Sequence, residues 1–356
     1  MSSNAAILGL ATAVPPHRLS QDDALAMARD ILAPRYPGFA RLESVFINAA
    51  IDNRYAVMPI DWYRAPRGWA DRGRAYLASA TALFVDVASG ALRDAGIAAQ
   101  AVDTIVTVSS TGIATPGLEA RALAAMGFRA DVRRVPVFGL GCAGGAGGLA
   151  LAARLAQAAP GENVLLVVVE TCTLAFRAQA PNKADIVASA LFGDGAAACI
   201  LRAGPGGDAM ARVAASAEHI WPDTLDIMGW DIGEEGLGVI FAQAIPAFAR
   251  AHLAEAFAGI FARWGMRNAD FADHVLHPGG AKVIVALEET LGLASGHLQR
   301  EREILRDFGN MSAPTVLFVL ERALRTGLRG PALRGPALLA ALGPGFTLNC
   351  VLLEPA

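Results

Sequence analysis

The chain has 356 residues, of which 54% are hydrophobic and 18% are charged, and its formal net charge is −3. This composition supplies a large apolar core and argues against a disordered chain, and the small net charge gives no basic field that would attract nucleic acid. The length exceeds that of a usual single domain, which favours one large α/β unit or two fused halves.

Targeting signals and cysteine spacing bear on the compartment. The first 20 residues are apolar but lack the basic segment of a secretory signal, and no 18-residue apolar run is free of both charges and glycines. The cysteines are widely spaced and form no C-x-x-C pair: Cys142, Cys172, Cys199 and Cys350. This spacing indicates free thiols rather than a zinc site or a disulfide framework. We therefore expect a cytoplasmic protein without stable membrane insertion.

Strands and helices alternate along the first half of the chain. The apolar patterns predict helices at residues 21–33, 78–94, 117–128 and 145–157, and strands at 102–110, 132–140, 163–170 and 195–203. Ser20 followed by Asp23 is typical of a helix N-cap, Gly96 ends the second helix, and Pro116 begins the third. Such alternation predicts a layered α/β fold whose sheet is covered by helices on both faces.

The second half repeats this alternation. The patterns predict a long helix at residues 239–265, a strand, turn and helix at 273–292, a capped helix at 309–324, and two closing strands at 336–355. Pro246 is expected to be tolerated near the start of the long helix. The glycine-rich segment at 203–208 separates the halves. We predict an N-terminal half at residues 1–210 and a C-terminal half at residues 211–356.

A glycine-rich turn before the helix at 145–157 admits two interpretations. Gly139, Gly141 and Gly144 spell G-x-G-x-x-G, the fingerprint of a dinucleotide-binding turn. Cys142 lies inside the turn, where the N–H groups and positive partial charge of a helix start would lower the pKa of a thiol and favour a nucleophilic thiolate. A small buried apolar residue is the ordinary alternative role for a cysteine.

Two further polar residues lie at similar transitions. His277 follows a strand and precedes a helix, which is where ligands bind in layered α/β folds. Asn310 lies in a loop just before a helix that Ser312 can cap and Pro314 can begin, although an ordinary turn asparagine would look the same. A cysteine that accepts an acyl group, with an imidazole and an amide that donate hydrogen bonds to an oxyanion, would suit acyl transfer.

Other functional classes fit these residues less well. A dinucleotide site needs its glycines in an early βαβ unit and an acid about 20 residues later, whereas the nearest acid that ends a following strand is Glu170. A papain-like hydrolase also uses Cys, His and Asn, but this chain lacks the C-G-[SA]-C-[WY] motif. A binding protein without activity stays open, because an inactive homologue would have a similar sequence.

Several motifs, in order and over most of the chain, resemble those of type III polyketide synthases, the chalcone synthase-like family. They are the opening ILGLATAVPPHRLSQ, the turn GLGCAGG, the segment ALFGDGAAA, the motifs HPGG and GNMSAPTVLFVLE, and the closing loop GPGFT. Ketoacyl-ACP synthase III enzymes also combine Cys, His and Asn, but they usually carry His-Gln-Ala-Asn where this chain has HPGG. They are the second resemblance.

The first resemblance implies a thiolase-like αβαβα fold made of two similar halves, and a homodimer. It implies that Cys142 accepts the acyl group and that His277 and Asn310 stabilise the enolate formed when malonyl-CoA loses its carboxylate. Phe192 would separate the CoA tunnel from the active-site cavity, with plain core packing as the alternative. The implied substrates are CoA thioesters, namely an acyl-CoA starter and malonyl-CoA, and no metal or redox cofactor is implied.

Departures from the plant enzymes bear on the starter. The candidate substrate-binding residues are Val239, where a second phenylalanine is usual, Cys172 and Ala175, where threonines are usual, Gly343 and Pro344 in the closing loop, and Thr115. Small apolar side chains here resemble bacterial enzymes with a tunnel for a long acyl chain, since each buried CH₂ contributes about 0.8 kcal/mol. We therefore expect a long-chain fatty acyl-CoA starter and alkylpyrone or alkylresorcinol products.

The cations that would bind CoA phosphates match the family poorly. Arg41 and Arg54 are the candidates in the early part of the chain, and Lys282, close after HPGG, fits better. A weak CoA site would be consistent with a starter delivered by an acyl carrier protein.

Overall fold

A nine-stranded sheet crosses the computed structural model, which describes residues 4–179, 181–204, 208–234, 236–242, 245–325 and 333–356. Its strand order is β11-β12-β13-β8-β1-β7-β6-β4-β5. The first half of the chain supplies β1 (Ala5–Ala13), β4 (Val102–Val108), β5 (Arg133–Val137), β6 (Asn163–Thr171) and β7 (Asp194–Ala203). The second half supplies β8 (Ala211–Ile220), β11 (Asp273–Leu276), β12 (Ala337–Gly343) and β13 (Thr347–Glu354). The halves join where residues 5–7 of β1 pair antiparallel with residues 211–213 of β8.

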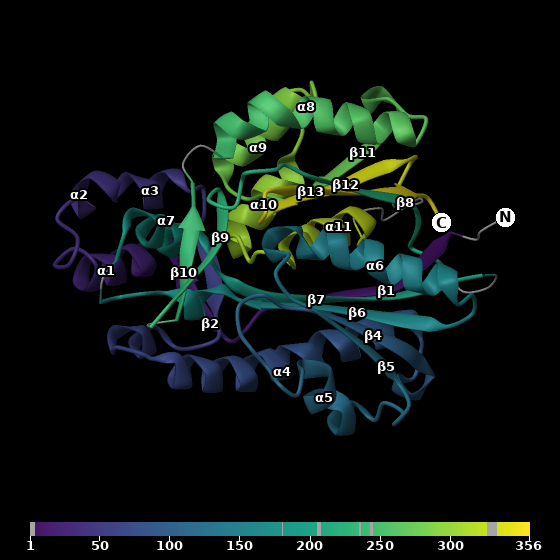
Figure 1. Ribbon diagram of the computed structural model, residues 1–356, viewed down its shortest axis with the longest axis horizontal. Helices are drawn as coiled ribbons and strands as arrows, with labels where there is room; N and C mark the ends of the chain where they lie inside the picture. Colours follow the sequence, from purple (N-terminus) through teal and green to yellow (C-terminus); the bar gives the residue numbers. More distant parts are fainter. Residues whose placement is uncertain (1–3, 180, 205–207, 235, 243–244, 326–332) are drawn as a thin grey trace.

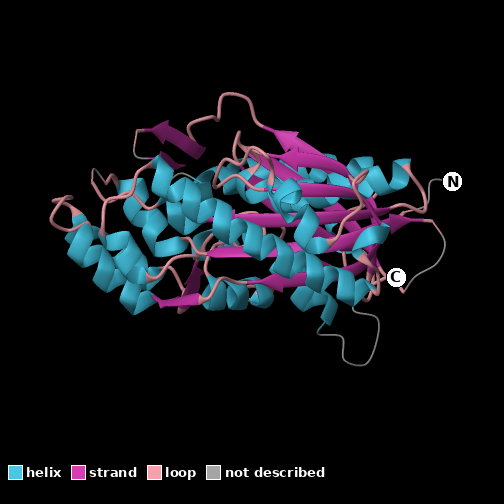
Figure 2. Ribbon diagram, turned by 90° about the horizontal axis from the view of Figure 1, so that it is seen from below, coloured by secondary structure: helices cyan, strands magenta, loops and turns pink. Residues whose placement is uncertain are grey.

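Helices and strands form five layers (Figure 1). Helices α4 (Trp69–Ala95) and α5 (Leu118–Met126) cover the strands of the first half, α6 (Gly144–Ala158) and α11 (Thr315–Arg325) fill the middle, and α8 (Ile245–Arg263) and α9 (Ala281–Thr290) cover the strands of the second half. Figure 2 shows the same strands enclosed by helices. The predicted αβαβα layering is confirmed.

The other elements gather mainly at one end of the molecule, on the left in Figure 1. They are α1 (Gln21–Ile31), α2 (Phe39–Leu42), α3 (Ser44–Asn48), α7 (Lys183–Leu191), the hairpin of β2 (His17–Ser20) with β3 (Asn53–Ala56), and the hairpin of β9 (Met228–Gly233) with β10 (Gly236–Phe241). Helix α10 (Gln299–Phe308) packs against α9 and α11. This end encloses the cavities of the site.

Local signals account for most element boundaries. Ser20 caps α1 by accepting a hydrogen bond from the N–H of Asp23 at 3.1 Å, and Gly96, with φ +64°, ends α4. The predicted long helix at residues 239–265 is wrong at its start, because residues 239–241 belong to β10. Pro246 explains this difference, since a proline fits the first turn of a helix but disrupts its interior.

Helix α4 is long and apolar enough to cross a membrane by length and composition alone. Its apolar face is buried against β1 and β7, where Phe84, Val87 and Ala88 are at most 1% exposed. This is the packing of a core helix in a layered fold.

The two middle helices approach closely because the start of α6 lacks side chains. A Cβ atom on Gly145 would overlap the carbonyl oxygen of Ala313, which lies just before α11. Only glycine leaves room for this approach. It sets the start of α6 beside the loop that carries Asn310, so the packing of these two helices positions the site.

Candidate active site

Cys142 lies where the chain passes from β5 through a 3₁₀ turn, Gly141–Ala143, into α6. This is the strand-to-helix position that the glycine pattern predicts. Gly141 has φ +46°, and a Cβ atom there would lie 2.7 Å from the ring of Pro344. The turn is therefore pressed against the closing loop of the chain, and Cys142 is only 7% exposed, at the wall of a cavity.

Burial decides the protonation state of this thiol. It raises the pKa of Cys142 to about 11, the side-chain hydrogen bonds with Ser312 and Asn310 lower the pKa by less, and the nearby charge of Glu170 raises it. The sequence predicts a lowered pKa from the start of α6, and burial outweighs that effect. Cys142 is therefore a neutral thiol at neutral pH and has to lose its proton in order to act as a nucleophile.

His277 follows β11 and holds a neutral imidazole. Its backbone N–H donates to the carbonyl of Ala340 at 2.9 Å, and the residue is 4% exposed. Burial lowers the pKa of His277 to about 4, so the ring offers one N–H donor and one free nitrogen at neutral pH. Within the described residues neither ring nitrogen has a hydrogen-bond partner. An unpartnered buried ring of this kind is suited to a ligand, because burying it without a partner is unfavourable.

Asn310 connects the histidine loop to the cysteine turn. Its Nδ2 donates to the carbonyl of Gly279 at 3.1 Å, and its Oδ1 accepts from the N–H of Ser312 at 2.8 Å. A Cβ atom on Gly279 would lie 3.7 Å from Cδ2 and 3.8 Å from Nε2 of His277. The Asn310 side chain also lies close enough to Cys142 to lower the pKa of its thiol. The structure thus brings together three polar side chains that are far apart in the sequence.

Two aromatic rings separate the cysteine from the outer surface. Phe192 directly follows α7 and contacts Phe241 of β10 edge-to-face, with ring centroids 6.4 Å apart. Phe192 lines the cavity at Cys142, and Phe241 lines both that cavity and an outer one. This location fits the separating role predicted for Phe192. Phe241 is not predicted as a site residue, because the apolar run at residues 239–241 predicts a helix.

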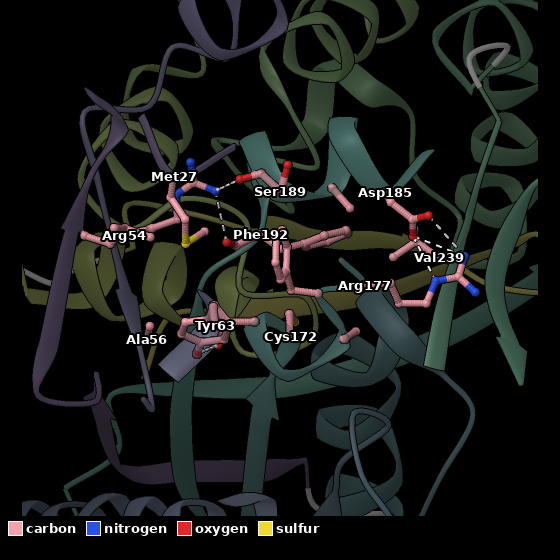
Figure 3. Close-up of a pocket in the computed structure, with 15 residues that line it drawn as sticks. Met27, Arg54, Ala56, Tyr63, Cys172, Arg177, Asp185, Ser189, Phe192 and Val239 are labelled. Atoms are coloured by element: carbon pink, nitrogen blue, oxygen red, sulfur yellow. Dashed lines mark hydrogen bonds and ion pairs between the residues drawn. The ribbon is translucent and has the colours of Figure 1, made fainter. Parts of the chain in front are cut away.

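Three cavities share the side chain of Val239 as a common wall. The first, of about 40 Å³, contains Cys142 and Cys172. The second, of about 50 Å³, lies beyond Cys172 and Phe192 and is shown in Figure 3. The third, of about 920 Å³, lies between α3, α7, β10 and the start of α9. We call them the cysteine cavity, the inner chamber and the outer cavity.

The predicted substrate-binding residues fall in different places. Those that line the cysteine cavity or the inner chamber are Arg54, Cys172, Ala175, Phe192, Val239 and Pro344. Gly343 lies behind the wall instead, where a Cβ atom would be pressed onto Ala143. Thr115 is exposed, precedes a cis bond to Pro116, and lines none of the three cavities, contrary to the prediction.

Two lysines mark the outer cavity. Lys282 is exposed at the start of α9 and lines this cavity, as a CoA-binding cation would. Lys183 is exposed at the start of α7 and lines the same cavity from the other half of the chain. They are the only two lysines in the sequence. Asp226 and Asp231 also line the cavity, so its charge is mixed.

Arg54 does not lie at the surface, and the predicted contact with CoA phosphates is wrong. It is 1% exposed, and its Nη1 donates to the carbonyls of Ser189 at 2.6 Å and Phe192 at 3.2 Å. A guanidinium bonded in this way inside the protein is not available to a phosphate in solvent. Arg41, in α2, is exposed but lines none of the three cavities.

Glu170 supports the cysteine cavity from behind, a role that the sequence pattern does not predict. Its two oxygens accept from the N–H of Ser110 at 3.1 Å and 3.0 Å, and Oε2 accepts from the hydroxyl of Thr111 at 2.7 Å. Burial raises the pKa of Glu170 to about 8. Ser110 and Thr111 line the cavity. An acid at the end of a continuous apolar strand is the one sequence signal for this network.

The remaining cysteines are buried thiols. Burial raises the pKa of each above its ordinary value: Cys172, Cys199 and Cys350. All four cysteines are free, as the spacing predicts. In the part of the chain that the structure describes, no three His, Cys, Asp or Glu side chains lie close enough to hold a metal ion.

Two family models match the chain. The N-terminal domain of chalcone and stilbene synthases matches residues 2–205, and the C-terminal domain of chalcone and stilbene synthases matches residues 212–355. Together they cover nearly the whole sequence.

Individual proteins match over a similar extent. The chain is 38% identical over 349 residues to 1,3,6,8-tetrahydroxynaphthalene synthase of Streptomyces peucetius subsp. caesius, covering 96% of this chain and 91% of that protein. It is 31% identical over 352 residues to 3,5-dihydroxyphenylacetyl-CoA synthase of Amycolatopsis balhimycina, covering 97% and 92%. The crystal structure of 1,3,6,8-tetrahydroxynaphthalene synthase from Streptomyces coelicolor A3(2), a bacterial type III polyketide synthase, superposes with a TM-score of 0.92 at 28% identity, covering 98% of this chain and 99% of that one.

Proposed function

Because the chain belongs to the chalcone and stilbene synthase family and is a type III polyketide synthase, we propose that Cys142, His277 and Asn310 carry out its decarboxylative Claisen condensation. One observation carries this proposal: Asn310 lies close to Cys142 and bonds to Gly279 next to the His277 ring, which has no partner among the described residues. Acyl transfer needs a nucleophile, a proton acceptor and donors to an oxyanion. These three residues supply them.

The first step transfers the starter. The sulfur of Cys142 attacks the thioester carbonyl of an acyl-CoA while the thiol proton passes to the free nitrogen of His277. The carbon–sulfur bond to CoA then breaks, and the departing CoA thiolate takes that proton. Because the pKa of the thiol is about 11 and that of the imidazole about 4, the proton moves as the attack proceeds rather than before it.

The second step extends the chain. Malonyl-CoA loses CO₂, and the oxygen of the resulting enolate accepts hydrogen bonds from Nδ2 of Asn310 and the N–H of His277. The enolate carbon attacks the Cys142 thioester, the carbon–sulfur bond breaks, and Cys142 leaves as a thiolate that can attack the CoA thioester of the lengthened chain. Each step only exchanges a thioester, releases CO₂ or transfers a proton, so the reaction needs no metal or redox cofactor.

For the starter we propose a long-chain fatty acyl group, with alkylpyrone or alkylresorcinol products. The inner chamber supports this choice (Figure 3). Cys172, Ala175 and Val239 give it small or apolar walls next to the cysteine cavity, and Met27 extends the apolar lining. Each buried methylene contributes about 0.8 kcal/mol, so such a lining favours an aliphatic chain over a short polar one.

A short starter is the second candidate, because the tetrahydroxynaphthalene synthases named above are relatives of this chain. The inner chamber is also lined by Arg54, by Tyr63, and by the ion pair of Arg177 with Asp185, whose atoms are 3.2 Å apart. These polar groups suit an oxygen-rich polyketide intermediate better than the end of an alkyl chain. The product would then be a polyhydroxylated aromatic compound.

We propose that Lys183 and Lys282 bind the phosphates of CoA at the outer cavity. An acyl carrier protein presents its chain on a phosphopantetheine, so it could deliver a starter at the same place. We also propose a cytoplasmic homodimer. Ile113 and Phe138 follow β4 and β5 at the edge of the sheet with 63% and 57% of their surface exposed, an apolar surface that a second copy could cover.

Mass spectrometry of the products tests this function. The purified protein is incubated with malonyl-CoA and acyl-CoA starters from acetyl to palmitoyl. Cyclised products grown by two or three ketide units, absent with Cys142→Ala, would support the iterative reaction. A single extension left as a β-ketoacyl thioester, or undiminished product from Cys142→Ala, would contradict it.

The starter preference separates the two candidates. Faster turnover of long acyl-CoA starters than of short ones would support alkylated products. Product formation from short starters alone would support the second candidate. Val239→Phe narrows the wall shared by the three cavities. We therefore expect this variant to reduce turnover of palmitoyl-CoA more than turnover of acetyl-CoA.

A further inference from the structure

We propose that Arg54 is a positioning residue that aligns Asn310 with Phe192. This inference rests on the roles proposed above for those two residues. Arg54 lies on β3, is 1% exposed, and owes its lowered pKa, about 9, to burial alone. Burying a cation without a carboxylate partner is unfavourable unless other groups compensate it. The compensating groups therefore indicate what this side chain does.

Carbonyl groups at the end of α7 take the place of a carboxylate. Nη1 of Arg54 donates to the carbonyls of Ser189 and Phe192, and Figure 3 shows the guanidinium turned toward both residues. The last carbonyls of a helix carry negative partial charge, which favours a cation there. Nη2 donates to Oε1 of Gln21, whose Nε2 donates to the carbonyl of Ala190 at 3.1 Å. The guanidinium thus ties the end of α7 to α1 and β3.

The end of α7 is bonded in turn to the segment that carries Asn310. The N–H of Asn310 donates to the carbonyl of Leu191 at 2.9 Å, and the N–H of Gly193 donates to the carbonyl of Asn310 at 3.0 Å. These bonds form a short parallel bridge between Phe192 and Asn310. A displacement of residues 191–193 would therefore move the backbone of Asn310 as well.

Two glycines allow Arg54 to pack at this junction. A Cβ atom would lie 3.1 Å from Cβ of Arg54 if placed on Gly193, and 3.3 Å from it if placed on Gly309. Gly309 has φ +69°, a conformation that glycine adopts without strain. The residue after Phe192 and the residue before Asn310 thus contact the same side chain. Arg54 acts on the reaction through these two segments.

Arg54→Met tests the proposal, because it removes the donors and keeps an unbranched side chain. We expect kcat for malonyl-CoA decarboxylation, followed as CO₂ release, to fall about 10- to 100-fold, since small displacements of catalytic groups have effects of this size. The KM for malonyl-CoA should stay near the wild-type value. Alkylation of Cys142 by iodoacetamide should change far less, because the cysteine is held by α6.

Three further variants separate positioning from stability. Arg54→Lys keeps a cation that can donate to the same carbonyls and should restore most of the lost kcat. Gln21→Met removes one acceptor of the guanidinium and should have an intermediate effect. Arg302→Met is the matched control: Arg302 donates to Glu288 at 2.7 Å and to the carbonyl of Leu298 at 3.2 Å, outside the site. It should lower the melting temperature and leave the decarboxylation kcat unchanged.

A folded Arg54→Met protein with wild-type decarboxylation would overturn the proposal, and so would an equal loss in Arg302→Met. If Arg54→Met does not fold, wild-type kcat in both Arg54→Lys and Gln21→Met would overturn it. Asn310→Ala distinguishes the two levels of inference. Normal decarboxylation by Asn310→Ala would refute the catalytic assignment of Asn310. If Asn310→Ala loses decarboxylation and the Arg54 variants keep it, only the positioning role of Arg54 is refuted.

Discussion

The Cys142 thiol, with a pKa of about 11, and the His277 imidazole, with a pKa of about 4, are both neutral over the whole range between those values. This differs from a preformed thiolate with an imidazolium, in which the nucleophile is charged before the substrate arrives. A neutral thiol is less readily oxidised than a thiolate, because the susceptibility of a cysteine to oxidation increases with its thiolate fraction. The turn sequence predicts where Cys142 lies but not the direction of its pKa shift, since burial comes from Pro344 and Ser312 far along the chain.

The reaction of Cys142 with iodoacetamide is expected to accelerate steadily with pH. Only the thiolate reacts, and raising the pH toward the thiol pKa increases its fraction about tenfold per unit, so the rate should rise roughly 100-fold from pH 7 to pH 9. Peptide mass spectrometry follows the modification, with Cys142→Ser as the control. A rate that reaches a plateau below pH 7 would reveal a preformed thiolate and contradict this picture.

Among the elements, α6 gives up helix stability for proximity. Four of its first five residues are glycines: Gly144, Gly145, Gly147 and Gly148. A glycine inside a helix costs about 1 kcal/mol relative to alanine, so this start is intrinsically weak. In exchange for this lower helix stability, α6 contacts the segment before α11 closely. This contact brings the cysteine turn to Asn310. The glycines at the start of α6 thus serve the approach of two helices.

Gly145→Ala is expected to damage both stability and catalysis. The added methyl group would overlap the carbonyl of Ala313, and such overpacking typically lowers the free energy of unfolding by about 1–3 kcal/mol. Gly259→Ala is the matched control in α8, where a Cβ atom meets open space, and it should raise stability by about 0.5–1 kcal/mol. Urea unfolding and product formation measure the two effects. Equal stability and activity in both variants would refute the argument.

Sequence patterns predict the helices and strands whose formation depends on neighbouring residues. They do not predict structure that is determined by contacts with distant segments of the chain. His277 and Asn310 can be found because each follows a local change of pattern. Residues 239–241 form an apolar run without a clear period, and their strand pairing with β9 comes from the tertiary fold. Arg54 is expected at the surface like most arginines, and its burial depends on carbonyls more than 130 residues later in the chain, since Ser189 is 135 positions away.

For the molecule as a whole, the outer cavity is shared between the two halves of the chain. Lys183 comes from α7 in the first half and Lys282 from α9 in the second. The strands of the two halves join through three pairs of residues, Ala5 with Val213, Ala6 with Arg212 and Ile7 with Ala211. A ligand that contacts both lysines would therefore also link the halves.

Lys183→Gln and Lys282→Gln are each expected to raise the KM for malonyl-CoA up to about fivefold, because an exposed charge contact contributes at most about 1 kcal/mol to binding. The kcat should change little, because the contact stabilises the bound substrate and the transition state equally. High salt should reduce the difference from the wild type. Malonyl-N-acetylcysteamine, which lacks phosphates, should be used equally well by all variants, and Arg267→Gln, outside the three cavities, is the protein control. An unchanged KM in the double variant would refute a phosphate-binding role.

Strand β1 lies in the middle of the sheet, although its partners come much later in the chain. Ala5 pairs with Ala203 of β7 and with Val213 of β8. During synthesis at about 5–20 residues per second, this apolar strand waits on the order of 10 to 40 seconds for either partner. An unpaired apolar strand is prone to aggregate over that time, so a chaperone that holds the nascent chain should raise the yield of folded enzyme. Among the nine strands of this sheet, β1 waits longest between its synthesis and its pairing.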